Sequence, residues 1–134
     1  MLIEGFAERY QLGVPQMDAT HGEFIDLLNR LYDTDKVEFI ALFPLLLAHT
    51  RTHFDSENAL MNNYGFPAIR EHMEEHQRVL GELDRFAEKA RNGSILMARA
   101  YVREQLPQWF SLHAVSMDSA LAAHIKRHRD QQCS

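Results

Sequence analysis

The sequence predicts an all-α protein, an up-down-up-down four-helix bundle with an N-terminal arm. Three observations predict it. Apolar residues recur at helical spacing in four long stretches, short polar breaks separate these stretches, and nothing resembles a hairpin or a strand of useful length. Four amphipathic helices with short connections pack as antiparallel neighbours. We expect residues 1–134 to form one domain, because this length is typical of a single domain with a sizeable core.

The first helix is expected over about residues 19–33, after an arm formed by residues 1–17. Residues 13–15, Gly-Val-Pro, favour a turn at the end of the arm. Asp18 is a favourable N-cap, because a carboxylate there can accept a hydrogen bond from a free backbone N–H of the first turn. Apolar residues then recur three and four positions apart, at Phe24, Leu27, Leu28 and Leu31.

Three further helices are expected at about residues 37–63, 68–91 and 95–129. The second should end at the sequence Asn-Asn-Tyr-Gly-Phe-Pro, because glycine and proline both stop a helix. The third should end at Asn92-Gly93, a favourable C-terminal cap. Pro107 is expected to bend or divide the fourth helix, because proline lacks the N–H that an α-helix uses.

The composition excludes several classes of protein. Apolar residues make up 46% of the chain and charged residues 25%, as in an ordinary folded domain. The net charge is −5 and the chain has no basic stripe, so we expect no nucleic-acid partner. The longest apolar stretch, residues 39–48, is far too short for a membrane span, and we find no signal peptide. For the same reason we expect no membrane partner. The single cysteine, Cys133, cannot form an internal disulfide, which fits a reducing compartment, so we expect a cytoplasmic protein.

Seven polar residues fall on helix faces that should be buried. One buried histidine is more often a hydrogen-bonded core residue than a ligand. Seven such groups on four helices would carry a large desolvation cost without a metal ion. The pattern therefore predicts a metal site in the bundle core, built from His21, His53, Glu57, His72, His76, His113 and Asp118.

The spacing within each helix supports one shared site. The pairs on the second and third helices are four residues apart, so each pair lies on one face. On the fourth helix, His113 and Asp118 are five residues apart, which turns them about 140° away from each other on a regular α-helix. For both to face the core the helix must widen, so we predict a π-type turn between them.

Four segments around these residues resemble the hemerythrins, most closely the bacterial ones. They are Gly13 to His21, His53 to Glu57, His72 to His76, and Trp109 to Asp118. The resemblance runs from about Tyr10 to Ala123, and all seven ligand positions match in type and order. It implies a centre of two non-haem iron ions with a bridging oxo or hydroxo group. It also implies reversible binding of molecular oxygen, for storage, scavenging or delivery.

The resemblance implies a division of ligands between the two irons. One iron would take His72, His76 and His113, the other His21 and His53, and Glu57 and Asp118 would bridge both. These ligands and the bridging oxygen atom fill all but one of the coordination positions of two octahedral ions. The remaining position, on the iron with two histidines, is open to molecular oxygen. We expect an apolar lining there, formed by Phe24, Phe54, Trp109, Phe110 and Ala114. Asn58 stands where the family often has a second glutamate, and is expected to face away from the site.

Two other functions remain open at this point. A di-iron oxidoreductase such as a peroxidase is disfavoured, because oxygen-activating sites in bundles are typically richer in carboxylates; weak peroxidase-type activity is compatible with the ligands. An oxygen or redox sensor would act through a partner protein, since the chain has no room for an output domain. An oxygen-using enzyme is a possible recipient of the oxygen. The oligomeric state is not indicated, and zinc or manganese would fit the same ligands as iron.

Overall fold

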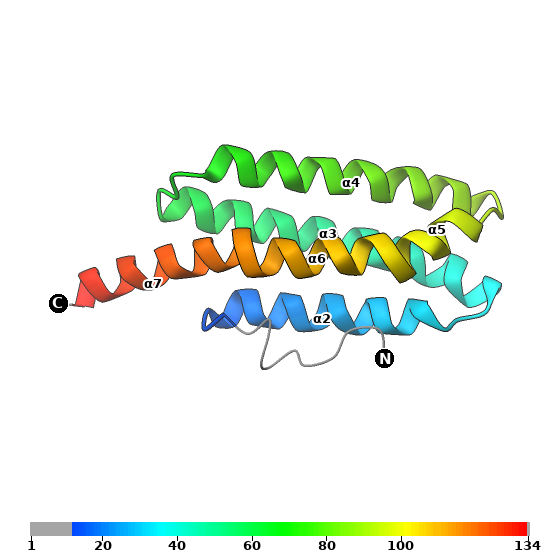
Figure 1. The fold of residues 1–134 in the computed structure, drawn as a ribbon, viewed down its shortest axis with the longest axis horizontal. Helices are drawn as coiled ribbons and strands as arrows, with labels where there is room; N and C mark the ends of the chain where they lie inside the picture. The colour runs from blue at the N-terminus through cyan, green and yellow to red at the C-terminus, as the bar shows by residue number, and fades with distance from the viewer. Residues whose placement is uncertain (1–11, 134) are drawn as a thin grey trace.

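The computed structural model describes residues 12–133, and these form a bundle of four long helical stretches (Figure 1). The first three are α2 (Pro15–Tyr32), α3 (Lys36–Asn63) and α4 (Ile69–Arg91). The fourth comprises α5 (Leu96–Ala100), η1 (Tyr101–Gln105), α6 (Leu106–His113), η2 (Ala114–Asp118) and α7 (Ser119–Cys133). Successive stretches run in opposite directions, which confirms the predicted all-α, up-down-up-down architecture. Residues 1–11 of the predicted arm lie outside the described residues.

The first helix begins at Pro15, earlier than the predicted start near residue 19, so residues 15–17 do not belong to the arm. Proline favours the first turn of a helix, because the N–H that it lacks would have no partner there. Val14 occupies the N-cap position, which corrects the prediction for Asp18. The Asp18 carboxylate instead accepts hydrogen bonds from the backbone N–H groups of Leu12, at 2.7 Å, and Gly13, at 3.1 Å. It thereby holds the turn that precedes the helix.

The ends of α3 and α4 follow local capping chemistry. Asp35 caps α3, and its carboxylate accepts a hydrogen bond of 2.8 Å from the backbone N–H of Glu38. α4 ends at Arg91, and Gly93 follows with a φ of 87°, a left-handed conformation that glycine adopts without strain. The N–H of Gly93 donates to the carbonyl of Ala90 at 2.9 Å. The predicted C-terminal cap at Asn92-Gly93 is therefore confirmed.

The fourth helical stretch contains two π-helical turns. η2 runs from Ala114 to Asp118, directly after His113, and confirms the predicted widening between these two ligand-type residues. η1 ends just before α6, whose first turn contains Pro107. A proline ring collides with the carbonyl one turn earlier in a regular helix, so a wider turn at this point accommodates it. The expected division of the fourth helix near Pro107 is therefore a π-helical turn directly before α6.

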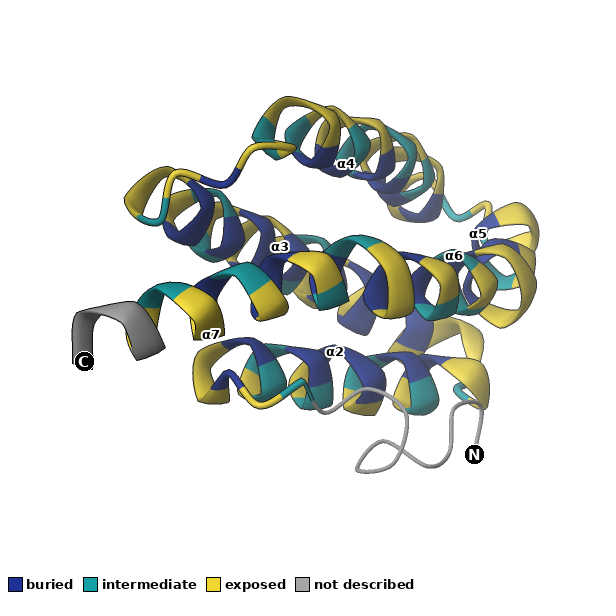
Figure 2. Cartoon of the chain, turned by 60° about the vertical axis from the view of Figure 1, so that its left-hand side comes forward, coloured by how far each residue is buried: buried dark blue, intermediate teal, exposed yellow. Residues whose placement is uncertain are grey.

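Buried apolar residues form two clusters, one toward each end of the bundle. The larger cluster includes Leu31 and Phe39, beside the α2–α3 connection. The smaller includes Met61 and Phe66, beside the α3–α4 connection. In Figure 2 the buried faces of the helices turn toward the inside of the bundle. None of the helices in residues 12–133 combines the length and apolar character that a membrane crossing requires.

A layer of polar side chains separates the two clusters. Along α2, His21 lies between Met17 of the smaller cluster and Phe24 of the larger one. Along the fourth stretch, Asp118 lies between Ala114 of the larger cluster and Leu121 of the smaller one. The fold therefore encloses the predicted metal-site residues between two apolar layers, where bulk water is excluded.

Candidate metal centre

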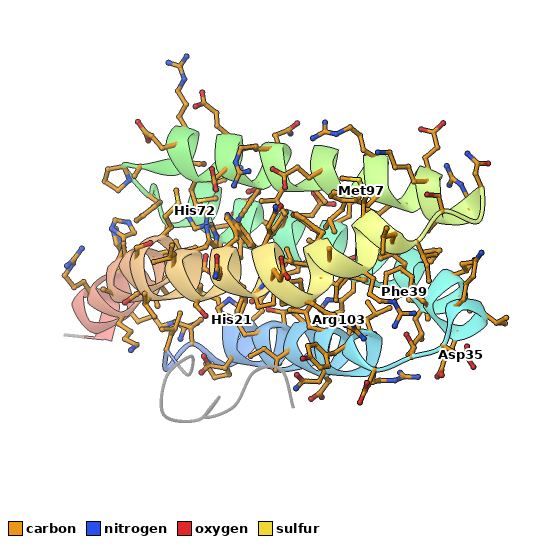
Figure 3. All side chains as sticks on the ribbon, turned by 45° about the vertical axis from the view of Figure 1, so that its right-hand side comes forward. His21, Asp35, Phe39, His72, Met97 and Arg103 are labelled. Atoms are coloured by element: carbon orange, nitrogen blue, oxygen red, sulfur yellow. The ribbon has the colours of Figure 1, made fainter. Side chains whose placement is uncertain are left out.

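The seven predicted ligand-type residues are all buried, with exposed fractions of at most 4%. α2 carries His21, α3 carries His53 and Glu57, and α4 carries His72 and His76. His113 is the last residue of α6 and Asp118 the last residue of η2. Figure 3 shows His21 and His72 on α2 and α4, toward the same end of the bundle. Every helical stretch therefore contributes at least one of these side chains to the cluster.

The cluster divides into two groups that share both carboxylates. One group consists of Glu57, His72, His76, His113 and Asp118, and the other of His21, His53, Glu57 and Asp118. Within each group, one nitrogen or oxygen atom per residue lies within 4.8 Å of all the others. Each group is therefore compact enough to surround one metal ion.

Asp118 directs one carboxylate oxygen to each group. Its Oδ1 lies 3.0 Å from Nε2 of His72 and 3.0 Å from Nε2 of His113. Its Oδ2 lies 3.0 Å from Nε2 of His21, in the other group. A carboxylate in this orientation can serve as a bridge between two ions.

Glu57 has the same orientation from the facing helix. Its Oε1 lies 3.3 Å from Nε2 of His72 and 3.2 Å from Nε2 of His76. Its Oε2 lies 2.7 Å from Nε2 of His53 and 3.5 Å from Nε2 of His21. Two carboxylates on two helices thus each connect the histidines of one group with those of the other.

All five histidines turn Nε2 toward the carboxylates, so that Nδ1 points outward. Nδ1 of His76 lies 3.1 Å from Oδ1 of Asn58, at hydrogen-bond distance. The Nδ1 atoms of the other four are buried without a partner in the described part of the chain: His21, His53, His72 and His113. Among these residues, His76 is thus the one histidine of the cluster whose Nδ1 has a protein acceptor, which fixes the outer side of its ring.

Asn58 therefore faces His76, and the prediction that it faces away from the site is wrong. Neighbouring residues on a helix point about 100° apart, and Glu57 faces the centre of the cluster. On α3 alone, Asn58 would therefore point away from the site. The outward side of His76, on the neighbouring helix α4, lies where Asn58 can reach it. Contacts between helices of this kind carry no signal in the sequence.

Opposite charges face each other in the metal-free cluster. Burial by itself would lower the pKa of His21, but hydrogen bonds and charges from Asp118 and Glu57 outweigh it and raise this pKa to about 10. Burial also lowers the pKa of His72, but hydrogen bonds and charges from Asp118 and Glu57 outweigh it and raise this pKa to about 9. The neighbouring histidines also outweigh burial at Glu57 and Asp118 and hold both carboxyl pKa values well below their usual range. His21 and His72 are therefore protonated in the metal-free protein at neutral pH, and both face ionised carboxylates.

Buried atoms without hydrogen bonds indicate that the cluster fits metal ions. Oε1 of Glu57, Oδ1 of Asp118 and Nε2 of His76 are buried and have no hydrogen-bond partner among residues 12–133. Such orphaned groups are costly unless another partner binds them. For His76, burial lowers the pKa, which favours the neutral ring that coordinates metals. Imidazole and carboxylate ligands without thiolate suit iron among the transition metals.

Aromatic rings cover both groups of histidines. Phe110 meets His21 edge-on, with ring centroids 5.5 Å apart, and Phe24 lies 6.2 Å from His53. Phe54 contacts both groups, because its ring is 5.5 Å from that of His53 and stacks on His76 at 3.9 Å. These contacts place Phe24 and Phe110, among the residues of the predicted lining, beside the group with two histidines.

The remaining two lining residues have different surroundings. Trp109 stacks on His113, with ring centroids 4.5 Å apart, and therefore lies beside the group with three histidines. Ala114 is fully buried in the larger apolar cluster. The structure thus does not bring all five predicted lining residues to one side of the cluster.

Sequence reasoning missed a polar contact that holds Trp109. Its Nε1 donates a hydrogen bond of 2.6 Å to Oε1 of Glu75. Glu75 also pairs with Arg78, and hydrogen bonds from Arg78 and Trp109 lower its pKa to about 2. Glu75 lies one residue before His76 and falls on the exposed face in a helical projection of α4. The contact with Trp109, on another helix, is therefore evident only from the fold.

Comparisons with known proteins agree with the geometry of the site. The family model described as the hemerythrin HHE cation binding domain matches residues 12–130. A bacteriohemerythrin of Ralstonia nicotianae is 35% identical over 125 residues, which cover 93% of this chain and 90% of that protein. A bacteriohemerythrin of Aquifex aeolicus is 29% identical over 117 residues, which cover 81% of this chain and 87% of that protein.

A solved structure, the crystal structure of a wild-type hemerythrin, has the same fold. The TM-score is 0.84, and the match covers 92% of this chain and 97% of that chain. The two sequences are 20% identical, so this likeness is evidence for the fold alone.

Proposed function

The chain belongs to the hemerythrin family, and from this premise we propose that it binds molecular oxygen reversibly at a di-iron centre. The di-iron cofactor of this family fits the buried cluster of histidines and carboxylates. One observation carries the proposal: Glu57 and Asp118 each direct one oxygen to the three-histidine group and the other to the two-histidine group. This is the arrangement that two bridged metal ions require.

In this proposal the two ions have unequal surroundings. His72, His76 and His113 would hold one ion, His21 and His53 would hold the other, and Glu57 and Asp118 would each offer one oxygen to either ion. The group with two histidines offers fewer ligands, so the open position belongs to it. When bound, two ferrous ions supply the electrons that reversible oxygen binding needs.

The surrounding side chains support binding rather than turnover. Phe24 and Phe110 are almost fully buried beside the two-histidine group, and their rings exclude water there. Water at this position would promote oxidation of the irons, and the bound oxygen would then leave in a reduced form. Five imidazoles with two carboxylates also stabilise high-valent iron less than a carboxylate-rich set does. We therefore infer a protein for oxygen storage, scavenging or delivery, rather than an enzyme.

Iron analysis combined with visible spectra tests this proposal. The reduced protein should contain two irons per chain, develop a charge-transfer band in air, and lose that band under argon. His53→Leu should abolish the band, whereas His128→Ala, which changes a histidine outside the cluster, should preserve it. A folded protein that takes up no iron, or a band that never reverses, would refute reversible binding. Rapid turnover of peroxide with a reducing substrate would instead indicate an oxidoreductase.

A further inference from the structure

Two histidines outside the metal cluster form a second pair of metal-ligating side chains, on α7. His124 and His128 are four residues apart, so they lie on one face of this helix. Both are half-buried. Their ring centroids are 4.5 Å apart, and the ring planes are inclined by 52°. The two imidazoles are therefore close enough to bind one ligand together.

This pair has nearly the same geometry as a pair within the cluster. His72 and His76 on α4 are also four residues apart, with ring centroids 4.5 Å apart and ring planes inclined by 64°. Both belong to the three-histidine group, whose nitrogen and oxygen atoms are placed to surround one metal ion. On α7 the chain thus repeats, away from the cluster, the arrangement of rings that α4 presents to it.

A backbone carbonyl fixes the orientation of His124. Nε2 of this ring lies 2.7 Å from the carbonyl oxygen of Tyr64, the C-cap residue of α3. Because a carbonyl can only accept a hydrogen bond, Nε2 carries the proton, and Nδ1 of the neutral ring keeps its lone pair. Metal-binding histidines almost always donate their other N–H in this way. His124 is therefore held in a tautomer that is ready to coordinate a metal ion through Nδ1.

Aromatic rings from the α3–α4 connection pack against both histidines. The ring of Tyr64 meets His128 edge-on, with centroids 6.1 Å apart, and the ring of Phe66 meets His124 edge-on at 5.4 Å. The pair thus takes its geometry from the contact between α7 and this connection. An ion that binds both rings would stabilise that contact, because it binds the folded state alone.

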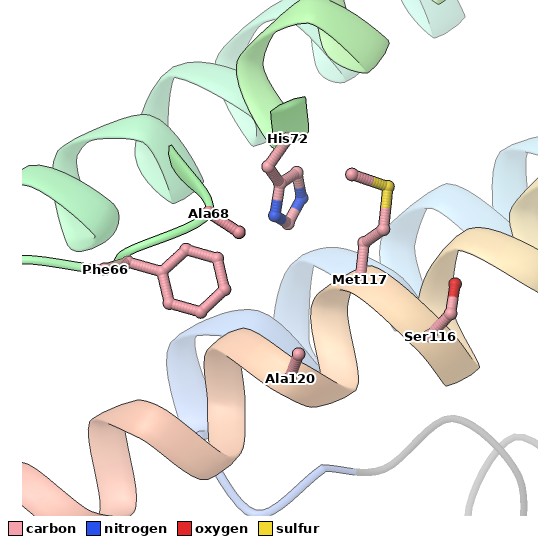
Figure 4. Close-up of a pocket in the computed structure, with 6 residues that line it drawn as sticks. All are labelled: Phe66, Ala68, His72, Ser116, Met117 and Ala120. Carbon is pink, nitrogen blue, oxygen red and sulfur yellow. The ribbon is translucent and has the colours of Figure 1, made fainter. Parts of the chain in front are cut away.

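Phe66 separates this pair from the metal cluster. Its ring, which packs against His124 on one side, lies 6.3 Å from the ring of His72. Figure 4 shows Phe66 and His72 in the space between the start of α4 and α7. An apolar pocket of about 240 Å³ lies there, and neither a carboxylate nor a second imidazole from residues 12–133 lines it. The pair on α7 is therefore a separate site and not an extension of the cluster.

The chemistry of the pair determines which ions fit. Imidazole suits zinc, copper and nickel, whereas magnesium and calcium prefer carboxylate and carbonyl oxygens. Lys126 and Arg127, both exposed, adjoin the pair on α7 and disfavour ions that are held by charge alone. Iron(II) binds such a site more weakly than zinc or copper(II) does. The pair therefore favours the later transition metals over the iron that we propose for the cluster.

We propose that His124 and His128 bind one divalent ion of zinc or copper, with water at the remaining coordination positions. Because His124 is tied to the carbonyl of Tyr64, the bound ion fastens the last turns of α7 to the end of α3. This site goes beyond the proposed oxygen binding and does not depend on it, so either proposal can fail without the other.

Calorimetric titration of the iron-loaded protein with Zn²⁺ tests the site, because iron already occupies the cluster. We expect one Zn²⁺ per chain. His124→Ala and His128→Ala should each lower the affinity at least about tenfold, since even the partner behind a ligand typically contributes that much. His128→Cys, which supplies a thiolate ligand, should retain binding. His49→Ala removes a half-buried histidine outside both sites and should leave zinc binding unchanged.

Two further measurements check the geometry. Nitrogen NMR of the metal-free protein should show neutral His124 protonated at Nε2, and protonation at Nδ1 would contradict the contact with Tyr64. Zn²⁺ should raise the melting temperature of the iron-loaded parent but not that of His124→Ala. The proposal is overturned if the iron-loaded parent takes up no zinc. Equal zinc affinity in the parent and both alanine variants would overturn it too, because the ion is then adventitious and bound elsewhere.

Discussion

Asn58 and His76 form a link between α3 and α4 on the outer side of the metal cluster. Oδ1 of Asn58 lies 3.1 Å from Nδ1 of His76, so the ring donates its Nδ1–H and keeps Nε2 free for a metal ion. The other four histidines of the cluster have no such acceptor for Nδ1 in residues 12–133. The three-histidine group is therefore the more strongly oriented of the two.

Replacing Asn58 by leucine should weaken metal binding at the three-histidine group. Without the acceptor, His76 loses its fixed orientation and tautomer, and such changes typically cost about tenfold to a hundredfold in metal affinity. Competition with a chelator of known affinity measures the effect. Asn58→Gln, which retains an amide oxygen, should recover part of it. Asn62→Ala, at an exposed position of the same helix, is the control, and an equal loss there would refute a specific role for Asn58.

Fluorescence of Trp109 should report metal binding. It is the single tryptophan of the chain, and its ring stacks on His113 with centroids 4.5 Å apart. A paramagnetic iron ion bound to His113 would quench an indole at this distance. We therefore expect the emission to rise several-fold when a chelator removes the metal, and to fall again on reloading. Emission that is independent of metal content would show that His113 is not a ligand.

The stability of the metal-free protein should fall as pH rises above neutrality. The pKa of His21 is raised from 6.5 to about 10, and that of His72 to about 9, so folding favours their protonated forms. This contribution is fully present below pH 6.5 and is lost as pH rises through 9 and 10. Several kcal/mol of unfolding free energy are at stake, which thermal unfolding between pH 6 and pH 10 measures.

The carboxylates contribute to the stability of the metal-free protein with the opposite pH dependence, and the metal-loaded protein is the control. Glu57 and Asp118 have lowered pKa values, so their contribution is lost as pH falls through the acidic range. The metal-free protein should therefore be most stable between about pH 4.5 and pH 6.5. In the metal-loaded protein the ions replace the two imidazolium protons, and the alkaline decline should disappear. A metal-free protein with equal stability at pH 6 and pH 10 would contradict the raised pKa values of His21 and His72.

Residues with a strong local signal were predictable from the sequence. The apolar period located all four helical stretches, and the five-residue spacing of His113 and Asp118 required the π-helical turn found at η2. The seven buried polar groups were identifiable because each lies on an apolar helix face. α2 begins earlier than the sequence predicts, because Asp18 is a favourable cap residue and Gly-Val-Pro favours a turn, whereas Pro15 lies in the first turn of the helix.

Contacts between helices could not be predicted, because they depend on side-chain reach across the bundle. The roles of Asn58 and Glu75 depend on His76 and Trp109, which lie on neighbouring helical stretches. The pocket beside His72 depends on how closely α4 approaches α7. Small differences in helix rotation decide each of these contacts, and a hydrophobic period fixes rotation only roughly.

Deletion of Val115 tests whether η2 exists for the sake of the metal site. Val115 is 53% exposed within η2, so its loss removes little packing and leaves His113 and Asp118 four residues apart. A regular α-helix then brings both to one face, but moves the carboxylate by about 1.5 Å along the axis. Metal-ligand distances tolerate only about 0.2 Å. The deletion should therefore preserve or raise the melting temperature of the metal-free protein and lower metal affinity by at least tenfold. Val115→Ala, which keeps the π-helical turn, should change neither quantity, and a deletion variant with undiminished metal affinity would show that the turn serves another purpose.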